Sequence, residues 1–206
     1  MKKVLSILLA IIMVTALFTA CGGTGENGGE TSTTSPGVEN IRVPEEKLDN
    51  ISYGNFENFK AVDLSGKTVT DKIFKGKKLT MVNIWATFCR PCINEMPYLE
   101  TLSKEYADKD FQIVGIVCDV SYSGDGYNKD LYQNALNIVE MTGVTYTNLL
   151  PSGSLDIIKL GEVYSVPETI FVDENGQVIG QSVIGSRNLD SWREIVDEAL
   201  ETMSNE

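Results

Sequence analysis

The stretch NIWATFCRPCINEMP, residues 83–97, places two cysteines two residues apart between a strand pattern and a helix pattern. The compact apolar run over residues 78–86 predicts a strand that is buried on both faces. After the cysteines, apolar residues recur at the spacing of one helix face, at Ile93, Met96, Leu99, Leu102 and Tyr106. Pro97 lies inside this predicted helix and is expected to kink it. Cys89 and Cys92 are therefore expected at a strand-to-helix turn.

The chain from about residue 53 onward alternates strand and helix patterns. Apolar positions flank the turn residues Ser65–Gly66 and Glu174–Asn175–Gly176, so hairpins are predicted over residues 56–70 and 168–185. Further strands are predicted at 111–120 and 145–151, and further helices at 127–143, 154–164 and 188–203. This order predicts an α/β domain with a mixed central sheet flanked by helices.

The N-terminal segment has the pattern of an export signal. Lys2 and Lys3 precede an almost wholly apolar run over residues 4–20, which predicts a signal peptide over residues 1–20. The run is also at the lower length limit for a membrane-spanning anchor that is not cleaved. The stretch LFTAC resembles the lipobox of bacterial lipoproteins, although Phe18 stands where that motif most often has leucine. The resemblance implies that Cys21 is lipidated.

A polar segment separates Cys21 from the predicted domain. Residues 22–40 are rich in Gly, Ser, Thr, Glu and Pro, and such a composition has too little apolar surface to offset the entropy of ordering. Residues 21–52 are therefore expected to be a lipidated cysteine followed by a flexible tether, and residues 53–206 a single domain. Residues 41–52 are left open between a linker and a docked segment.

Three interpretations compete for Cys89 and Cys92. A structural zinc site needs four ligands, but the chain has no histidine and no second paired-cysteine motif, so no metal site is expected. A structural disulfide across so short a loop would stabilise the fold little. A redox pair needs two thiols within bonding reach and a helix N-terminus that lowers the thiol pKa, and both are predicted here. Redox chemistry is the favoured interpretation.

Two motifs together resemble the thioredoxin superfamily. WATFCRPC, residues 85–92, is similar to its active site, and SVPETIFVD, residues 165–173, is similar to the segment that carries its cis-proline, here Pro167. The polar tether, the continuation CRPCINEMP and the extra helical segment between strands are similar to the TlpA/ResA-like group of membrane-anchored, extracytoplasmic thiol-disulfide oxidoreductases. Over about residues 54–203 the resemblance implies a thioredoxin-like fold with an N-terminal hairpin and an inserted helical segment.

The resemblance also implies roles for individual residues. Cys89 is expected to be the exposed attacking thiolate and Cys92 the resolving thiol. A substrate groove is expected at Trp85, Arg90, Pro91, Val166 and Pro167. Within that set Pro91 would stiffen the turn, and the backbone of Val166 and Pro167 would pair with a substrate segment. Arg90 is either a charge near Cys89 or a solvated surface residue, and Trp85 packs beside the site or simply fills the core.

Four other positions complete the predicted site. Thioredoxin itself carries a buried aspartate where this chain has Asn83. Glu95, three residues after Cys92, matches a glutamate of ResA-like proteins and is expected to tune the thiols or accept a proton; otherwise it interacts only with the helix dipole. Cys118 lies in a predicted buried strand and is expected to act as a small hydrophobe. Glu168 replaces the threonine that many relatives have, and it is expected to add negative charge near the groove.

The favoured function is a lipid-anchored, extracytoplasmic dithiol-disulfide oxidoreductase that reduces exported proteins. The resemblance implies substrates such as apocytochrome c, a membrane electron donor of the CcdA/DsbD type, and no bound cofactor beyond the redox-active disulfide. The net charge of −12, with no basic run, argues against a nucleic-acid partner.

Four alternatives remain beside this function. The same residues would serve a DsbA-like oxidant, since the Arg–Pro dipeptide between the cysteines does not fix the direction of electron flow. A peroxiredoxin-type peroxidase expects a threonine three residues before the reactive cysteine, whereas Thr87 is two before Cys89. A copper chaperone of the same fold expects a wider cysteine spacing and a histidine. A binding lipoprotein without enzymatic activity would not need the paired thiols.

Overall fold

The structure is a computed structural model that describes residues 40–204. The predicted signal peptide, Cys21 and most of the predicted tether lie outside the described residues. Within residues 40–204, no helix is both long enough and apolar enough to cross a membrane.

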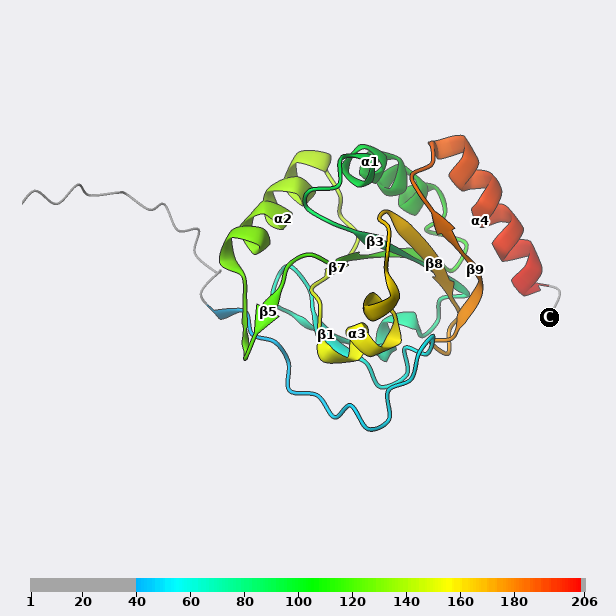
Figure 1. The fold of residues 1–206 in the computed structure, drawn as a ribbon. Coiled ribbons are helices and arrows are strands. Elements are labelled where there is room, and N and C mark those ends of the chain that lie inside the picture. The colour runs from blue at the N-terminus through cyan, green and yellow to red at the C-terminus, as the bar shows by residue number, and fades with distance from the viewer. Residues whose placement is uncertain (1–39, 205–206) are drawn as a thin grey trace, which may run out of the picture. The chain divides into compact units, whose positions relative to one another are not determined.

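A five-stranded mixed sheet forms the centre of the domain (Figure 1). The strand order is β7-β4-β3-β8-β9, with bounds Asn148–Leu149, Phe111–Val117, Leu79–Trp85, Glu168–Val172 and Val178–Ile184. β3 is parallel to β4, and β4 to β7, whereas β8 is antiparallel to both β3 and β9. The mixed α/β sheet predicted from the sequence is confirmed.

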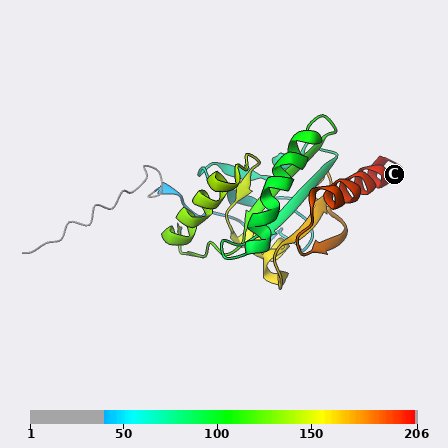
Figure 2. The same cartoon turned by 90° about the horizontal axis from the view of Figure 1, so that it is seen from above.

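Helices cover both faces of this sheet. α2 (Lys129–Thr142), α1 (Arg90–Glu105) and α4 (Leu189–Ser204) form a row along one face, as Figure 2 shows from above. The opposite face carries α3 (Gly153–Ile158) and the predicted hairpin of β1 (Lys60–Val62) and β2 (Thr68–Thr70). Two 3-10 turns, η2 (Asp71–Phe74) and η3 (Leu160–Glu162), follow β2 and α3 respectively.

The side chains of β3 explain its continuous apolar run. Val82 and Ile84 pack into the cluster beneath α3 and β1, whereas Met81 and Trp85 point to the side covered by the α2–α1–α4 row. Because successive side chains of a strand alternate between faces, a strand covered on both faces needs apolar residues throughout. Each such side chain stabilises the fold by roughly 1.5–3 kcal/mol relative to exposure. β3 is therefore held in place from both faces, and the turn that carries the cysteines follows directly after it.

The predicted ends of two elements are also observed. α2 ends at Gly143, whose φ of 70° is the left-handed conformation that glycine adopts without strain. The hairpin of β8 and β9 turns at Glu174–Asn175–Gly176, and Gly176 has a φ of 83°. α1 runs from Arg90 to Glu105 without a break at Pro97.

The segment left open between linker and docked chain packs against the domain. β5 (Tyr122–Ser123) and β6 (Gly126–Tyr127) form a small hairpin that the sequence patterns did not predict. Arg42 forms an antiparallel β-bridge with Gly126 of this hairpin. Glu46 accepts a hydrogen bond from the backbone N–H of Ser154, 3.1 Å away, at the start of α3. A carboxylate at a helix N-terminus stabilises that helix. The packed chain thus begins before residue 53, the boundary expected from the sequence.

Candidate active site

Cys89 and Cys92 form a disulfide at the N-terminus of α1. Cys89 is the N-cap residue, and the backbone N–H of Cys92 donates a hydrogen bond to Cys89 Sγ over 3.2 Å. This N–H is one of the groups at a helix start that have no partner within the helix, and it lies at the positive end of the helix dipole. After reduction, the same donor would stabilise a thiolate on Cys89.

The two cysteines differ slightly in access to solvent. Cys89 is 6% exposed, whereas Cys92 is fully buried. The turn that presents Cys89 is held by the segment after β4, because Asp119 accepts hydrogen bonds from both the backbone N–H and the hydroxyl of Thr87. Cys89 was expected to be exposed but is buried in this disulfide; only the order, with Cys89 more accessible than Cys92, agrees with the roles of an attacking and a resolving cysteine. Asp119 was not among the residues expected at the site.

The loop before β8 lies beside the disulfide. The Val166 carbonyl oxygen is 3.6 Å from Cys89 Sγ, and the Val166–Pro167 peptide bond is cis. In the disulfide the sulfur carries no proton, so this distance is a contact; a reduced Cys89 thiol would be able to donate to the carbonyl. The Pro167 carbonyl accepts a hydrogen bond of 2.8 Å from Gly185 N–H at the end of β9. The loop is thereby tied to the sheet on its far side.

The other residues expected to form the groove differ in their exposure to solvent. Arg90 and Pro91 are exposed in the first turn of α1, next to Cys89. Trp85 is fully buried, and its indole N–H donates to Asn148 Oδ1 over 2.9 Å. Because it belongs to a strand covered on both faces, Trp85 packs under the cysteines and does not line a groove. Of the two readings of Trp85, the core reading agrees with its burial.

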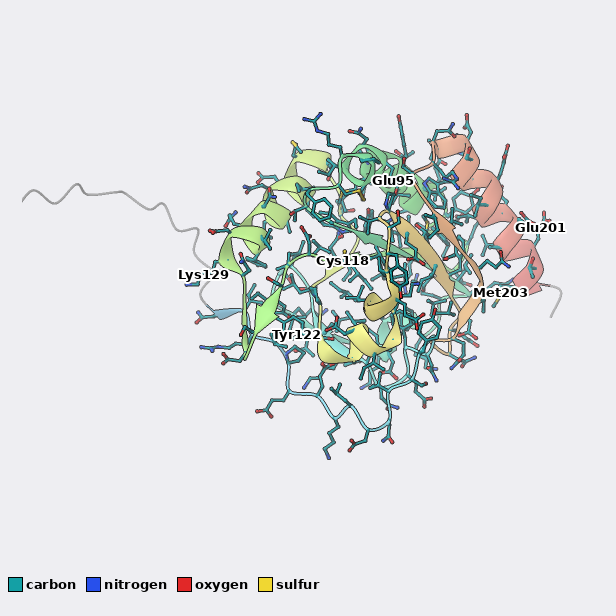
Figure 3. All side chains as sticks on the ribbon, in the orientation of Figure 1. Glu95, Cys118, Tyr122, Lys129, Glu201 and Met203 are labelled. Atoms are coloured by element: carbon teal, nitrogen blue, oxygen red, sulfur yellow. A yellow bond between two sulfur atoms is a disulfide. The ribbon has the colours of Figure 1, made fainter. Side chains whose placement is uncertain are left out.

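Glu95 is a buried carboxyl group between α1 and the sheet (Figure 3). It follows Cys92 by three residues, so both side chains lie on the same, buried side of α1. Glu95 accepts hydrogen bonds from Asn83 Nδ2 at 3.3 Å, from Arg187 N–H at 3.0 Å and from the indole N–H of Trp192 at 3.4 Å. All three donor groups are uncharged.

The surroundings of Glu95 shift its titration toward neutral pH. Burial raises the pKa of Glu95 from 4.5 to about 7, although the three hydrogen-bond donors and the more distant charge of Arg187 act in the opposite direction. Asn83 also donates to Thr169 Oγ1 over 3.2 Å, so a hydrogen-bonded chain connects α1, β3 and β8. A carboxyl group with this pKa is able to exchange a proton in the range where thiols react.

Cys118 is a free cysteine at the end of β4 (Figure 3). Its backbone N–H donates to the Trp85 carbonyl, and its side chain packs, half-buried, against the core. Burial, and secondarily the neighbouring Asp119 carboxylate, raises the pKa of the Cys118 thiol to about 11. The thiolate is the reactive form, so this cysteine is far less reactive at neutral pH than a typical thiol.

Glu168 does not present a free charge to the groove. Its side chain points to the face of the sheet that α3 covers and forms an ion pair with Lys159, with Nζ and Oε1 2.7 Å apart. Both side chains are more than nine-tenths buried. The expectation that Glu168 adds negative charge near the groove is therefore wrong, because a buried cation neutralises it. No sequence pattern indicated Lys159 as its partner.

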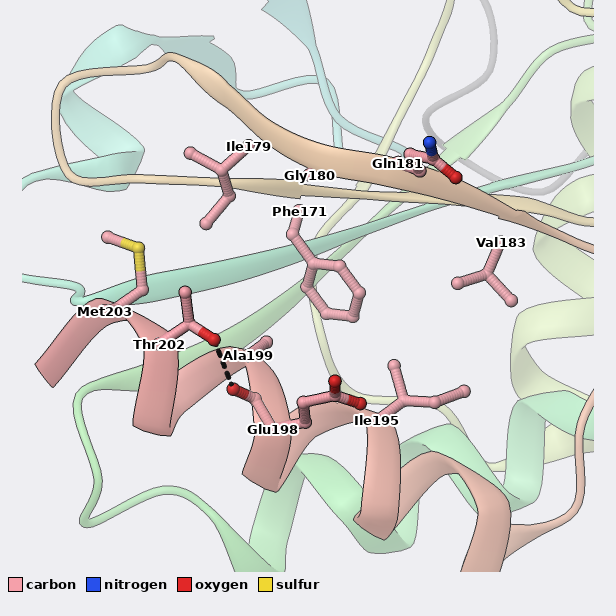
Figure 4. A pocket seen from close by; sticks show the side chains of 10 residues that line it. All are labelled: Phe171, Ile179, Gly180, Gln181, Val183, Ile195, Glu198, Ala199, Thr202 and Met203. Carbon is pink, nitrogen blue, oxygen red and sulfur yellow. Dashed lines mark hydrogen bonds between the residues drawn. The ribbon is translucent and has the colours of Figure 1, made fainter. Parts of the chain in front are cut away.

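A separate pocket lies between β9 and α4 (Figure 4). It has a volume of about 660 Å³ and is mainly apolar, with Phe171, Ile179, Val183, Ile195 and Met203 among its lining residues. None of the residues expected at the redox site lines it. The residues predicted for redox chemistry thus lie at the start of α1 and in the loop before β8, away from this pocket.

A strand-to-helix turn with a disulfide at the helix N-terminus, faced by a cis-proline loop, defines a thiol-disulfide exchange site on a thioredoxin fold. The family model described as Redoxin matches residues 46–191. The chain therefore belongs to the Redoxin family and is a ResA/TlpA-like protein of the thioredoxin superfamily.

Relatives of this chain carry names that agree with the site. It is 31% identical over 137 residues to the thiol-disulfide oxidoreductase ResA of Bacillus thuringiensis subsp. konkukian, covering 66% of this chain and 72% of the relative. It is 32% identical over 161 residues to the thiol:disulfide interchange protein DsbE of Vibrio cholerae, covering 76% and 78%.

A solved structure agrees as well. The crystal structure of a thiol:disulfide interchange protein of the thioredoxin family from Chlorobium tepidum matches 73% of this chain and 97% of its own, with a TM-score of 0.56 and 26% identity. The predicted thioredoxin-like fold is confirmed, and together with the Cys89–Cys92 pair these relatives support a thiol-disulfide oxidoreductase activity.

Proposed function

We propose that this chain reduces disulfides in exported proteins from outside the cytoplasm, held at the membrane by a lipid on Cys21. The proposal rests chiefly on the Cys89–Cys92 disulfide at the start of α1, with a backbone donor on Cys89 Sγ and the Val166 carbonyl beside it. The names of the relatives, oxidoreductase and interchange protein, fit disulfide exchange with protein substrates. The polar segment after Cys21 suits a tether.

The reaction proceeds through two exchanges. In the reduced protein, the Cys89 thiolate attacks one sulfur of a substrate disulfide; a mixed disulfide forms, and the other substrate sulfur leaves as a thiolate and takes up a proton. Cys92 then loses its proton to Glu95 and attacks Cys89 Sγ, which releases the second substrate thiol. The protein ends as the disulfide seen here, and two electrons have passed to the substrate.

The residues around the cysteines have separate roles in this proposed reaction. The helix N-terminus stabilises the attacking thiolate, and burial of Glu95 keeps a proton acceptor with a pKa near neutrality one turn from Cys92. The substrate segment pairs with the backbone at Val166, as an added strand would. A membrane electron carrier of the CcdA/DsbD type returns the disulfide to the dithiol, so no further cofactor is needed.

The reduction potential of the Cys89/Cys92 couple tests the proposal. The full-length chain, purified in detergent, would be equilibrated with thiol buffers of known potential. A value of about −270 mV, typical of thioredoxin, supports a reductant, whereas one of about −120 mV identifies an oxidant of the DsbA kind.

Two variants make this measurement specific. Cys89→Ser must abolish the couple, and Cys118→Ala must leave it unchanged, because the Cys118 thiol has a raised pKa and no disulfide partner in residues 40–204. A pair that shows no reversible couple would overturn the proposed function.

A further inference from the structure

A buried ion pair closes the base of the loop that faces the disulfide. Lys159 lies at the C-terminus of α3, and Glu168 is the first residue of β8. The chain between them, residues 160–167, contains η3, the exposed side chain of Tyr164 and the Val166–Pro167 bond. The 2.7 Å contact between Lys159 Nζ and Glu168 Oε1 therefore joins the two ends of this loop.

Both partners of the pair are held by their own backbones. Lys159 N–H donates to the Leu155 carbonyl over 3.0 Å, and its carbonyl accepts from Glu162 N–H over 3.1 Å. Glu168 is paired with Ile84 of β3 on one side and with Ile184 of β9 on the other. The ion pair consequently links α3 to the centre of the sheet, and neither side chain has much freedom to follow a displaced partner.

Val166 lies close to this closure. Its carbonyl oxygen is 3.6 Å from Cys89 Sγ, and it precedes Glu168 by two residues. The residues just before it, Tyr164 and Ser165, are exposed. The apolar side chains of the same loop, Leu160, Val163 and Val166, pack only partly buried against the core. On the other side of the sheet, Thr169 is fixed by Asn83. Adjacent residues of β8 are thus anchored on opposite faces, directly after the loop.

From this arrangement we infer that the Lys159–Glu168 pair is a positioning element that sets the Val166 backbone for pairing with a protein substrate. The inference rests on the proposed disulfide exchange. Replacing either member, or both, removes the Nζ–Oε1 contact that joins the two ends of the loop. In a single variant the remaining charge is also left buried without a partner, which is strongly unfavourable, and opening the loop toward water relieves it. Val166 then moves away from Cys89. A small dithiol reacts by reaching the sulfur alone, whereas a protein segment must also pair with the backbone.

Exchange with two reagents of different size tests the role. Full-length wild type, Glu168→Gln and Lys159→Met, kept reduced by dithiothreitol, would be assayed with insulin as a protein disulfide, with the insulin reduction by dithiothreitol alone subtracted. The oxidised proteins would be reacted separately with dithiothreitol as a small dithiol. The KM for insulin is expected to rise about ten- to a hundredfold in both variants, the range that a misplacement of about 1 Å costs. Exchange with dithiothreitol is expected to stay within about twofold of wild type. Unchanged KM values for insulin would overturn the inference.

Two controls separate positioning from general stability. The double variant K159M/E168L replaces the pair by apolar side chains, a change that often preserves stability; it is expected to keep the wild-type Tm and still show the raised KM. A double variant with a wild-type KM would overturn the role of the charges. Lys109→Met is the same substitution at an exposed ion pair, and it should change neither the KM for insulin nor the rate of exchange with dithiothreitol. A wild type that reacts with neither reagent would overturn the proposed function, and with it this role.

Discussion

The two faces of the central sheet each bury a glutamate close to the redox site, and they hold it in different ways. On the α1 side, Glu95 receives hydrogen bonds from an amide, a backbone N–H and an indole, and within residues 40–204 it forms no salt bridge. On the α3 side, Glu168 contacts the ammonium group of Lys159. A buried carboxyl group surrounded by neutral donors is free to change its protonation, whereas one that is paired with a cation ties two segments together.

The two environments suit different roles, proton transfer on one face of the sheet and positioning on the other. Both glutamates connect to the first residues of β8, Glu168 directly and Glu95 through Asn83 and Thr169. The uncharged surroundings of Glu95 favour a proton acceptor next to Cys92. The charged partner of Glu168 favours a fixed loop next to Cys89. Substitutions at Lys159 and Glu168 change one of these environments, and substitutions at Glu95 and Trp192 change the other.

Lys159→Met should have the largest effect on stability. It leaves the Glu168 carboxylate buried without a counter-charge, and breaking a buried pair in this way typically costs about 3–5 kcal/mol of unfolding free energy. Urea denaturation at pH 7 measures the loss. The matched K159M/E168L variant should recover most of it, because apolar side chains tolerate burial. A loss of less than about 1 kcal/mol in Lys159→Met would show that the pair is not the tie between α3 and β8.

Glu95→Gln should change the dependence of stability on pH. The pKa of Glu95 is about 7 in the folded chain and 4.5 ordinarily, so the folded state binds the proton more tightly. The wild type must therefore lose stability as the pH rises from about 4.5 to 7, by up to about 3 kcal/mol, and Glu95→Gln lacks this loss. Urea denaturation of both oxidised proteins from pH 4 to pH 8 measures the difference.

Two checks accompany the Glu95→Gln experiment. Glu201→Gln, an exposed glutamate of α4, is the control for removing one carboxyl group from an acidic chain. Curves for wild type and Glu95→Gln that run parallel across the whole range would contradict the raised pKa. In the reduced proteins, the same substitution should alter the pH profile of thiol reactivity, since Cys92 would lose its proton acceptor.

The sequence was sufficient for the features that depend on neighbouring residues. The β3 run, the two hairpin turns, the end of α2 at Gly143 and the position of the cysteines at a helix start all follow from local patterns. The partners of the two buried glutamates do not, because Arg187 and Trp192 follow Glu95 by more than ninety residues and only the sheet brings them together. Lys159 carries no motif that distinguishes it from a surface lysine, which is why the ion pair was missed.

Trp192→Phe should have the smallest effect, and it tests whether the neutral donors tune Glu95. The hydrogen bond from the indole N–H is long, at 3.4 Å, and it favours the ionised carboxylate, so its loss should raise the pKa of Glu95 further. A carbon-13 NMR titration of the Glu95 carboxyl group measures the pKa directly. The small cavity left by the substitution should lower the free energy of unfolding by about 1–2 kcal/mol at every pH, so it cannot be mistaken for a shift in the titration midpoint of Glu95. Trp85→Phe is the matched control, because that indole is equally buried but donates to Asn148. An unchanged midpoint in Trp192→Phe would leave the Asn83 amide and the Arg187 backbone N–H as the donors that oppose the effect of burial.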